Sequence, residues 1–287
     1  MKISSKYKNF RYTNLFTSLM DLGEFSKHST KIGGFDKKWA NFHLLSFLFD
    51  NYLEVSIFEG TIFGGNFDIN YFNPLILSNI LIKKYNTILG TNIKLKISKK
   101  SYLYNQFSFD DLKLKKYAFQ IGYKFFDLFN IKNLIFQSEY NQVQPYVYSS
   151  EEVLKNYTHY QEALAHPIGA NFKESVSFLN YRYKNILLEF KFNYVIYGKD
   201  STNTNFGKNI FLPYLDENFK GDKNSHGIKT FLIYKEFCIS YLLNPKTNLN
   251  ISFGISERKE NNKFENHKSL FYYFAMRTSL NNFYYDF

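Results

Sequence analysis

The stretch LLEFKFNYVIY, at residues 187–197, alternates apolar and polar side chains along most of its length. A β-strand turns successive side chains to opposite faces, so such a stretch forms a strand with one apolar and one polar face. The apolar face carries Leu188, Phe190, Phe192, Tyr194 and Ile196, and the polar face carries Glu189, Lys191 and Asn193. The pattern therefore predicts a long β-strand that separates two different environments.

The same alternation recurs from one end of the chain to the other, so the expected fold is all-β. It is clearest at residues 117–125 and 249–256. Weaker versions lie at residues 10–20, 40–44, 53–57, 93–97, 101–109, 134–140, 175–184, 229–242 and 269–287. Turn signals follow several of these segments, at Asp50-Asn51, Lys99-Lys100, Lys184-Asn185 and Asn244-Pro245-Lys246-Thr247-Asn248. Strands joined by tight turns predict antiparallel hairpins.

A soluble β-sandwich and a membrane β-barrel both have strands of this kind, but two features favour the barrel. Many segments reach about ten residues, the length that a tilted strand needs to cross hydrocarbon, whereas ordinary strands average about five or six. Aromatic residues such as Tyr117, Phe125 and Tyr194 gather near strand ends, as in an interfacial girdle. We therefore expect one domain, residues 1–287, that forms an antiparallel transmembrane β-barrel of about 12–14 strands with its aromatic faces toward lipid.

The C-terminus carries a more specific signal. Phe283, Tyr285 and Phe287 share one face of a segment that ends in Phe, which resembles the membrane-insertion signal of outer-membrane barrels. We expect residues 270–287 to form the closing strand. It should pair with residues 249–257 on one side and residues 10–20 on the other, because hydrocarbon offers no water to an unpaired strand edge.

The sequence contains no apolar run of about 18 residues, so no transmembrane helix is expected. Residues 1–10 are basic but lack the apolar core of a signal peptide. A barrel must be exported, so we expect either that the signal peptide has been removed from this chain or that the gene is shortened at its 5′ end and further N-terminal sequence is missing.

Composition limits the partners. Aromatic residues make up 21% of the chain, for which codon bias in an AT-rich genome is a competing explanation. The net charge of +11 suits nucleic acid, anionic lipid or lipopolysaccharide phosphate, or simply a solvated surface rich in lysine. The basic residues are dispersed and no nucleic-acid motif is present, so we expect no nucleic-acid partner. The single cysteine, Cys238, allows no internal disulfide and no cysteine-based zinc cluster.

Two segments do not fit the strand pattern. Within residues 65–88, Asn73-Pro74 could open a short helix through Leu75 and Leu81, and its apolar content predicts packing inside or under the barrel. Residues 143–172 form a long connection that is too aromatic for a free loop, so we expect it to fold into or over the lumen.

The long connection holds the candidate ligand-binding residues, which are Tyr146, Tyr148, Tyr157, His159, Tyr160 and His166. Tyrosine rings offer an apolar face and a polar tip, which suits the stacking of sugars. A metal site would need the two histidines with a nearby glutamate, but their spacing matches no compact zinc motif. A hydrolase would use Ser149 or Ser150, but no nucleophile elbow surrounds them. We therefore expect no catalytic residue, no metal and no cofactor.

The alternative to a ligand-binding role is purely structural. In that interpretation the tyrosines and histidines of the connection bind inward-facing polar residues of the barrel, such as Lys124, Gln137, Glu139 and Arg182.

Several motifs resemble those of the RemB-type gliding-motility proteins of Bacteroidetes, a family similar to the Wzi capsule-assembly barrels. They are Tyr12-Thr13-Asn14-Leu15-Phe16, Lys38-Trp39-Ala40-Asn41-Phe42-His43, Phe58-Glu59-Gly60, Phe67-Asp68-Ile69-Asn70-Tyr71-Phe72-Asn73-Pro74, the 143–172 stretch, Tyr241–Pro245 and the Phe283–Phe287 ending. Asn156–Tyr160 and Ala165–Phe172 are the most specific part of the resemblance. The resemblance implies an outer-membrane barrel linked to surface polysaccharide, with the barrel-assembly machinery as a partner. It carries over no catalytic residue.

Three functions follow from these observations. The first is a non-enzymatic protein of the bacterial outer membrane, associated with surface polysaccharide or with motility. The second is a passive outer-membrane channel for small solutes. The third is a soluble β-sandwich that binds a ligand. A lipid-facing aromatic belt would separate the first two from the third, and the polarity and occupancy of the lumen would separate the first from the second.

Overall fold

The protein is built around one antiparallel sheet of thirteen strands, in which almost every strand pairs with its neighbour in sequence. The computed structural model describes residues 1–22, 35–80, 82, 84–111, 116–201, 204–213 and 225–278. In sheet order the strands are β1 (Lys2–Tyr7), β2 (Phe10–Asp21), β3 (Asp36–Phe49), β4 (Leu53–Gly64), β5 (Asn86–Ser98), β6 (Ser101–Asp111), β7 (Lys116–Phe126), β8 (Leu134–Val143), β11 (Phe172–Tyr183), β12 (Ile186–Lys199), β13 (Ile228–Asn244), β14 (Leu249–Asn261) and β15 (Asn266–Arg277).

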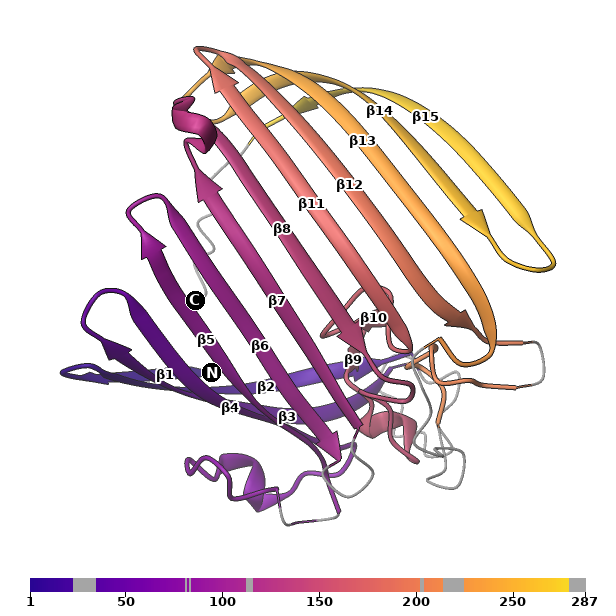
Figure 1. The fold of residues 1–287 in the computed structure, drawn as a ribbon. Helices are drawn as coiled ribbons and strands as arrows, with labels where there is room; N and C mark the ends of the chain where they lie inside the picture. The colour runs from indigo at the N-terminus through magenta and orange to yellow at the C-terminus, as the bar shows by residue number, and fades with distance from the viewer. Residues whose placement is uncertain are drawn as a thin grey trace.

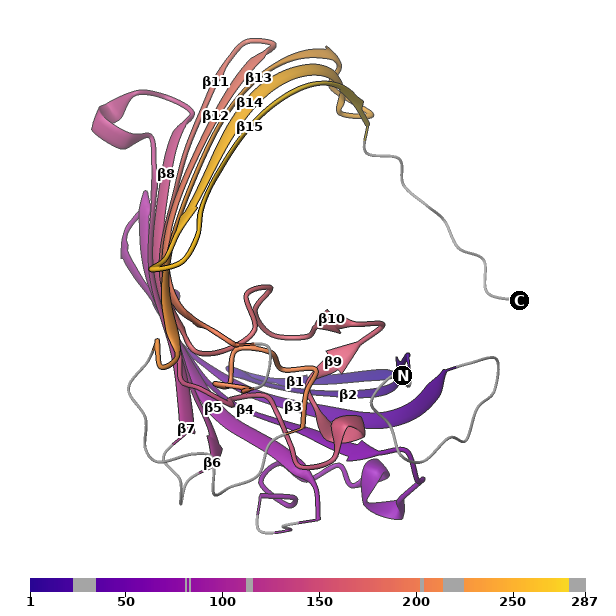
Figure 2. The same ribbon diagram turned by 90° about the vertical axis from the view of Figure 1, so that its right-hand side faces the viewer.

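The sheet curls around one concave side, as Figures 1 and 2 show. A separate two-stranded hairpin, β9 (Thr158–His159) and β10 (Glu162–Ala163), lies on that concave side (Figure 2). Three short 3₁₀ helices complete the described secondary structure: η1 (Ile69–Phe72), η2 (Leu128–Asn130) and η3 (Val153–Lys155). Within the described ranges, no helix combines the length and the apolar character that a membrane-spanning helix needs.

The predicted class of fold is confirmed, with thirteen strands in the main sheet. Every predicted strand segment except the last lies in one of these strands, apart from Lys184, and the predicted turns at Asp50, Lys99, Lys184 and Asn244–Asn248 connect them. The last predicted segment, 269–287, is a strand as far as Arg277, and its residues 279–287 lie outside the described residues. Sequence reasoning missed β1, because the Ser- and Lys-rich Lys2–Tyr7 has no apolar alternation.

The predicted closure is correct on one side of the last strand only. Residues 266–277 pair with residues 250–261, as expected. The expected partner on the other side is wrong, because β2 already pairs with β1 along one edge and with β3 along the other. Among the described residues, β1 and β15 are the two edges of an open sheet.

The alternation read from the sequence sorts side chains onto the two sides of the sheet as predicted. In β12, Val195 and Tyr197 are buried against the loops on the concave side, whereas Phe190 on the opposite face is 41% exposed. In β7, Ala118 is buried on the concave side and Ile121 is exposed on the convex side. The convex aromatics are not packed against a second sheet of described residues, and this arrangement argues against the sandwich.

The concave face away from the loops carries a polar network. Tyr104 donates a hydrogen bond to Glu139, and the side-chain amide of Gln120 donates to the same carboxylate at 3.0 Å. The Tyr104 ring lies over Gly122, where a Cβ atom would come within 2.2 Å of the ring. A residue larger than glycine would therefore push Tyr104 away from its partner.

The connections differ sharply between the two ends of the strands. At one end the strands are joined by residues 8–9, 50–52, 99–100, 127–133, 184–185 and 245–248. At the other end lie the connections 22–35, 65–85, 112–115, 144–171, 200–227 and 262–265, four of which are long. We refer to these as the short-turn end and the long-loop end.

The connection at 65–85 packs on the convex side of β2–β4, so the expectation that it lies inside or under the barrel is wrong (Figure 2). The Tyr71 ring lies 5.6 Å from Phe16 and 5.2 Å from Trp39. The side-chain amide of Asn41 donates to the Tyr71 carbonyl at 3.0 Å. The segment therefore shields aromatic and polar groups of the outer wall at the long-loop end.

The predicted helix from Leu75 onward is also wrong. The helical turn is η1, which ends before Pro74, and Leu77 has a φ of 68°, which no α-helix contains. The Glu59 carboxylate accepts hydrogen bonds from the backbone N–H groups of Leu77 and Asn79, at 2.5 and 3.1 Å. A tertiary contact thus satisfies the N–H groups that a helix would otherwise have used.

Candidate functional site

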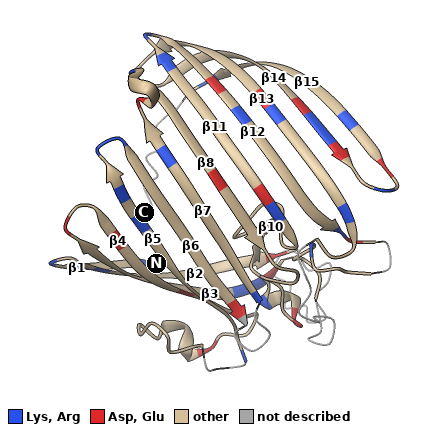
Figure 3. Ribbon diagram, viewed as in Figure 1, with Lys and Arg blue, Asp and Glu red and all other residues tan. Residues whose placement is uncertain are grey.

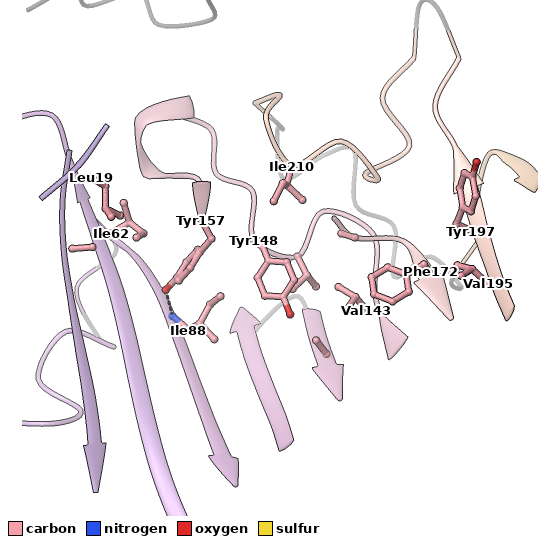
Figure 4. Close-up of a cluster of buried hydrophobic side chains, with 14 residues drawn as sticks. Leu19, Ile62, Ile88, Val143, Tyr148, Tyr157, Phe172, Val195, Tyr197 and Ile210 are labelled. Carbon is pink, nitrogen blue, oxygen red and sulfur yellow. Dashed lines mark hydrogen bonds between the residues drawn. The ribbon is translucent and has the colours of Figure 1, made fainter. Parts of the chain in front are cut away.

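The connection between β8 and β11, residues 144–171, folds onto the concave side at the long-loop end, which confirms the predicted location (Figures 2 and 4). Its apolar side chains share one buried cluster with the inward-facing residues of the wall. The cluster includes Leu19, Ile62, Ile88, Val143, Phe172 and Val195 from the strands, and Val147, Tyr148, Tyr157, Ala170 and Ile210 from the loops. The loop is therefore part of the hydrophobic core.

Tyr157 fixes the loop to the wall between β4 and β5. Its hydroxyl donates to the carbonyl of Gly60 and accepts from the backbone N–H of Ile88 at 3.1 Å (Figure 4). The side chain is buried, and burial, followed by the charge of Asp110, raises the pKa of Tyr157 well above its ordinary value. This tyrosine acts as a hydrogen-bonded anchor.

Tyr146 and Tyr148 are also buried anchors. The Tyr146 hydroxyl donates to the carbonyl of Asn205 at 2.6 Å, and the Tyr146 backbone N–H donates to that of Gly207 at 3.0 Å. The backbone N–H of Tyr148 donates to the Asp110 carboxylate at 3.1 Å. Both tyrosines have positive φ angles, 62° and 76°, which cost about 1–3 kcal/mol each and persist only where the surroundings hold them.

Lys38 of β3 also fixes the loop to the wall. Its side chain is fully buried, and its ammonium group donates to the carbonyl of Asn156 at 3.0 Å and to the Thr158 hydroxyl at 2.8 Å. The Asp21 carboxylate lies 3.6 Å from the same ammonium group. The sequence gives no hint that this lysine points inward toward a loop more than a hundred residues away.

The two histidines of the loop have separate roles in positioning it. His166 Nε2 lies 2.8 Å from the Glu174 carboxylate, which also accepts from Asn141 and Asn193 at 2.8 Å each. His159 Nδ1 accepts from the backbone N–H of Met20 at 3.1 Å. Among the described residues, no group of three His, Cys, Asp or Glu side chains is arranged to hold a metal ion.

The structure therefore divides the six candidate residues. Tyr146, Tyr148 and Tyr157 are buried and present no face on which a sugar could stack. Tyr160 is 47% exposed, and the centre of its ring lies 4.5 Å from the centre of the His159 ring. A ligand-binding role for these residues stays a prediction, and it now rests on Tyr160 and the two histidines.

The structural alternative named the wrong partners for the loop. Gln137 and Glu139 bind Tyr104 of the wall. The loop's side-chain partners include Lys38, Glu174 and Asp110, and further hydrogen bonds go to backbone groups. Phe283, Tyr285 and Phe287 lie outside the described residues, so their insertion role stays a prediction.

A cavity of about 760 Å³ lies between the β9–β10 hairpin and the connection after β12. Its lining combines apolar groups with amide and charged groups, among them Gln161, Glu162, Ile168, Lys199, Lys208 and Phe211. Sequence reasoning missed the second half of this lining, because residues 199–211 carry no aromatic-rich pattern and only the fold brings them beside residues 161–169.

The charges around the cavity are nearly balanced. Lys199 pairs with Glu265 at 2.6 Å, and Asp200 accepts from the backbone N–H groups of Phe206 and Asn209, at 2.5 and 3.0 Å. Glu162 and Lys208 add one charge of each sign. The Lys208 ammonium lies 4.9 Å from the centre of the Tyr197 ring, and burial lowers the pKa of Lys208 from its ordinary value. Such a lining suits a neutral, hydroxyl-rich molecule better than a strongly charged one.

Comparison with known proteins supports the fold. No protein-family model matches the chain, and no curated protein matches its sequence. Among solved structures, Wzi of Escherichia coli, an outer-membrane protein involved in group 1 capsule assembly and described as a carbohydrate-binding β-barrel, has a TM-score of 0.60 at 12% identity. The match covers 91% of this chain and 53% of Wzi, so the chain spans about half the length of that protein. OprD of Pseudomonas aeruginosa has a TM-score of 0.47 at 11% identity, over 98% of this chain and 70% of OprD.

The alternating faces, the curled antiparallel sheet and the similarity to Wzi define the class. The chain has the fold of an outer-membrane β-barrel, here as an open sheet.

Proposed function

We propose that the protein is a non-enzymatic component of the bacterial outer membrane that binds surface polysaccharide at its long-loop end. Outer-membrane barrels place short turns in the periplasm and longer loops outside the cell. Applied to this chain, the rule exposes the cavity and the β9–β10 hairpin to the cell exterior, where surface polysaccharide is found.

The cavity beside the hairpin carries this proposal. Pro167, Ile168 and Phe211 offer apolar surface for the C–H faces of a sugar ring, and Gln161 and Asn209 offer amides to its hydroxyl groups. Wzi, whose fold this chain shares, is described as carbohydrate-binding, and this supports the same ligand class here.

The test is a binding assay with the refolded protein and oligosaccharides of defined length, neutral in one set and rich in uronic acid in the other. The variant Glu162→Gln/Lys208→Gln changes two cavity groups with little change in size. Its control, Glu151→Gln/Lys173→Gln, changes the same residue types at exposed positions elsewhere. Binding of neutral oligosaccharides that weakens only in the cavity variant supports the proposal. The absence of binding to both sets contradicts it.

A passive channel is the second candidate, and the polar network of Tyr104, Gln120 and Glu139 on the concave face favours it. Planar-bilayer conductance separates the two functions. A polysaccharide-binding protein whose loop is anchored in its core should conduct poorly, whereas a channel should pass small solutes without removal of the loop.

A role in gliding motility rests on the sequence motifs alone, as does the assignment to the RemB-type proteins. Lipopolysaccharide and the barrel-assembly machinery are the further partners that residence in the outer membrane implies. Deletion of the gene from its native host, followed by motility and capsule assays, would test the motility role.

A further inference from the structure

Three lysines on the convex side of β13–β15 form a compact group near the long-loop end. They are Lys235, Lys259 and Lys268, and Glu257 lies among them; we call these four residues the convex lysine patch. All three lysines are exposed. Figure 3 shows charged residues on these three adjacent strands.

The patch carries more positive charge than its own carboxylate can balance. Lys259 and Lys268 are directly opposite each other in the β14–β15 pair, and Lys235 is opposite Glu257 in the β13–β14 pair. Like charges at directly opposite positions destabilise a sheet. The Glu257 carboxylate lies 3.3 Å from the Lys259 ammonium and 3.1 Å from that of Lys268. One carboxylate therefore forms ion pairs with two lysines, and the third, Lys235, is its cross-strand neighbour. A further anion at this position would remove the remaining repulsion.

The patch borders directly on an exposed apolar surface. Toward the short-turn end, the same faces of the same strands carry Phe237, Phe253 and Phe274, which are 44%, 51% and 74% exposed. On the outer wall of a barrel, aromatic side chains exposed to this extent contact the acyl chains of the membrane. A ligand that bridges both surfaces must carry anionic groups next to acyl chains.

Outer-membrane barrels carry their longer loops on the extracellular side, which places the long-loop end at the outer leaflet. From the charge, the neighbouring apolar belt and this orientation, we infer that the convex lysine patch binds the phosphate groups of lipopolysaccharide in the outer leaflet. The inference depends on residence in the outer membrane but not on polysaccharide binding in the cavity.

The test measures binding of fluorescent lipid A to the purified full chain in detergent micelles. The variant Lys235→Gln/Lys259→Gln/Lys268→Gln should bind about 100-fold more weakly, which is the attraction expected from three lysines near an anionic surface. Each single change should weaken binding about fivefold, so one poorly folding variant does not end the test. The matched control replaces three exposed lysines of the short-turn end, in the variant Lys132→Gln/Lys184→Gln/Lys246→Gln.

Three results would overturn the inference. They are equal binding by the patch variants and the control, equal binding of dephosphorylated lipid A, and equal competition by phosphatidylglycerol at the same charge. The last result would indicate a general attraction to anionic lipid. The cavity variant Glu162→Gln/Lys208→Gln should bind lipid A as the wild type does, so failure of the polysaccharide proposal remains distinguishable from failure of this one.

Discussion

Replacement of Lys38 by methionine should release the 144–171 loop from the wall while the sheet stays folded. Methionine keeps most of the apolar stem but removes the ammonium group, and with it the hydrogen bonds to the Asn156 carbonyl and the Thr158 hydroxyl and the ion pair with Asp21. A hydrogen bond from a charged donor contributes about 1.5–3 kcal/mol, and breaking a buried ion pair costs about 3–5 kcal/mol. Because the lysine is fully buried, solvent screens these contacts little. We therefore expect a loss of about 3–5 kcal/mol in the free energy of loop attachment.

The neighbouring Lys37→Met variant is the control. Lys37 is exposed and lies 4.0 Å from the centre of the Trp39 ring, so its loss should cost about 0.5–1 kcal/mol. Native-state hydrogen exchange is the assay, read at the amides of Tyr157 and Leu164, which donate within the loop to Tyr148 and Tyr157. Lys38→Met should accelerate their exchange at least about 100-fold relative to the control. Equal exchange in the two variants would refute the anchoring role. Equal acceleration in the strands would show that the change unfolds the whole protein.

Three further predictions test other parts of the structure. Phe192→Arg should cost about 2–4 kcal/mol in bilayer-embedded protein, because the arginine would face lipid, whereas Lys191→Gln on the concave face should cost less than about 1 kcal/mol, as measured by urea unfolding in vesicles. Tyr157→Phe should loosen the loop by about 1–3 kcal/mol, because it leaves the N–H of Ile88 buried without a partner; hydrogen exchange of that amide measures the effect. Hydrogen bonds from Lys84, from Tyr85 and from the backbone N–H of Asn70 hold the pKa of Asp68 well below its ordinary 3.8. The stability that this carboxylate gives to the 65–85 segment is therefore full above pH 3.8 and is lost as the pH falls toward the lower folded-state pKa. Fluorescence of Trp39, the one tryptophan, should report the loosening, because its ring packs against Phe67 and Tyr71.

Each of these predictions has a result that would contradict it. Equal costs for Phe192→Arg and Lys191→Gln would mean that the two faces do not meet different environments. Unchanged exchange at the Ile88 amide in Tyr157→Phe would remove the tyrosine's anchoring role. An acid-induced change in Trp39 fluorescence that persists unaltered in Asp68→Asn would locate the titrating group elsewhere.

The sequence predicted what depends on local periodicity. Residues 187–197 of β12 were predicted because successive side chains alternate between two environments, and the tight turn at Lys184 was predicted because it joins two such strands. Strand β1 was missed because Lys2–Tyr7 lies at the edge of the sheet, where all six residues are exposed and no alternation is required.

Features that depend on distant contacts could not be predicted. A helix after Pro74 was a reasonable local expectation, but the carboxylate of Glu59 binds the backbone N–H groups instead. A buried anchoring tyrosine and an exposed tyrosine for sugar stacking have the same sequence signature, so Tyr157 and Tyr160 could be separated only by their burial. The cavity arises where residues 161–169 meet residues 199–211, and no local pattern contains that pairing.

The central claim is that this chain resides in an outer membrane, and density-gradient fractionation of the native cells tests it most directly. With an antibody against the chain, the account predicts that the protein sediments with outer-membrane markers and stays in the pellet after a carbonate wash. Recovery of the native protein in the soluble fraction, free of membrane without any detergent, would contradict it.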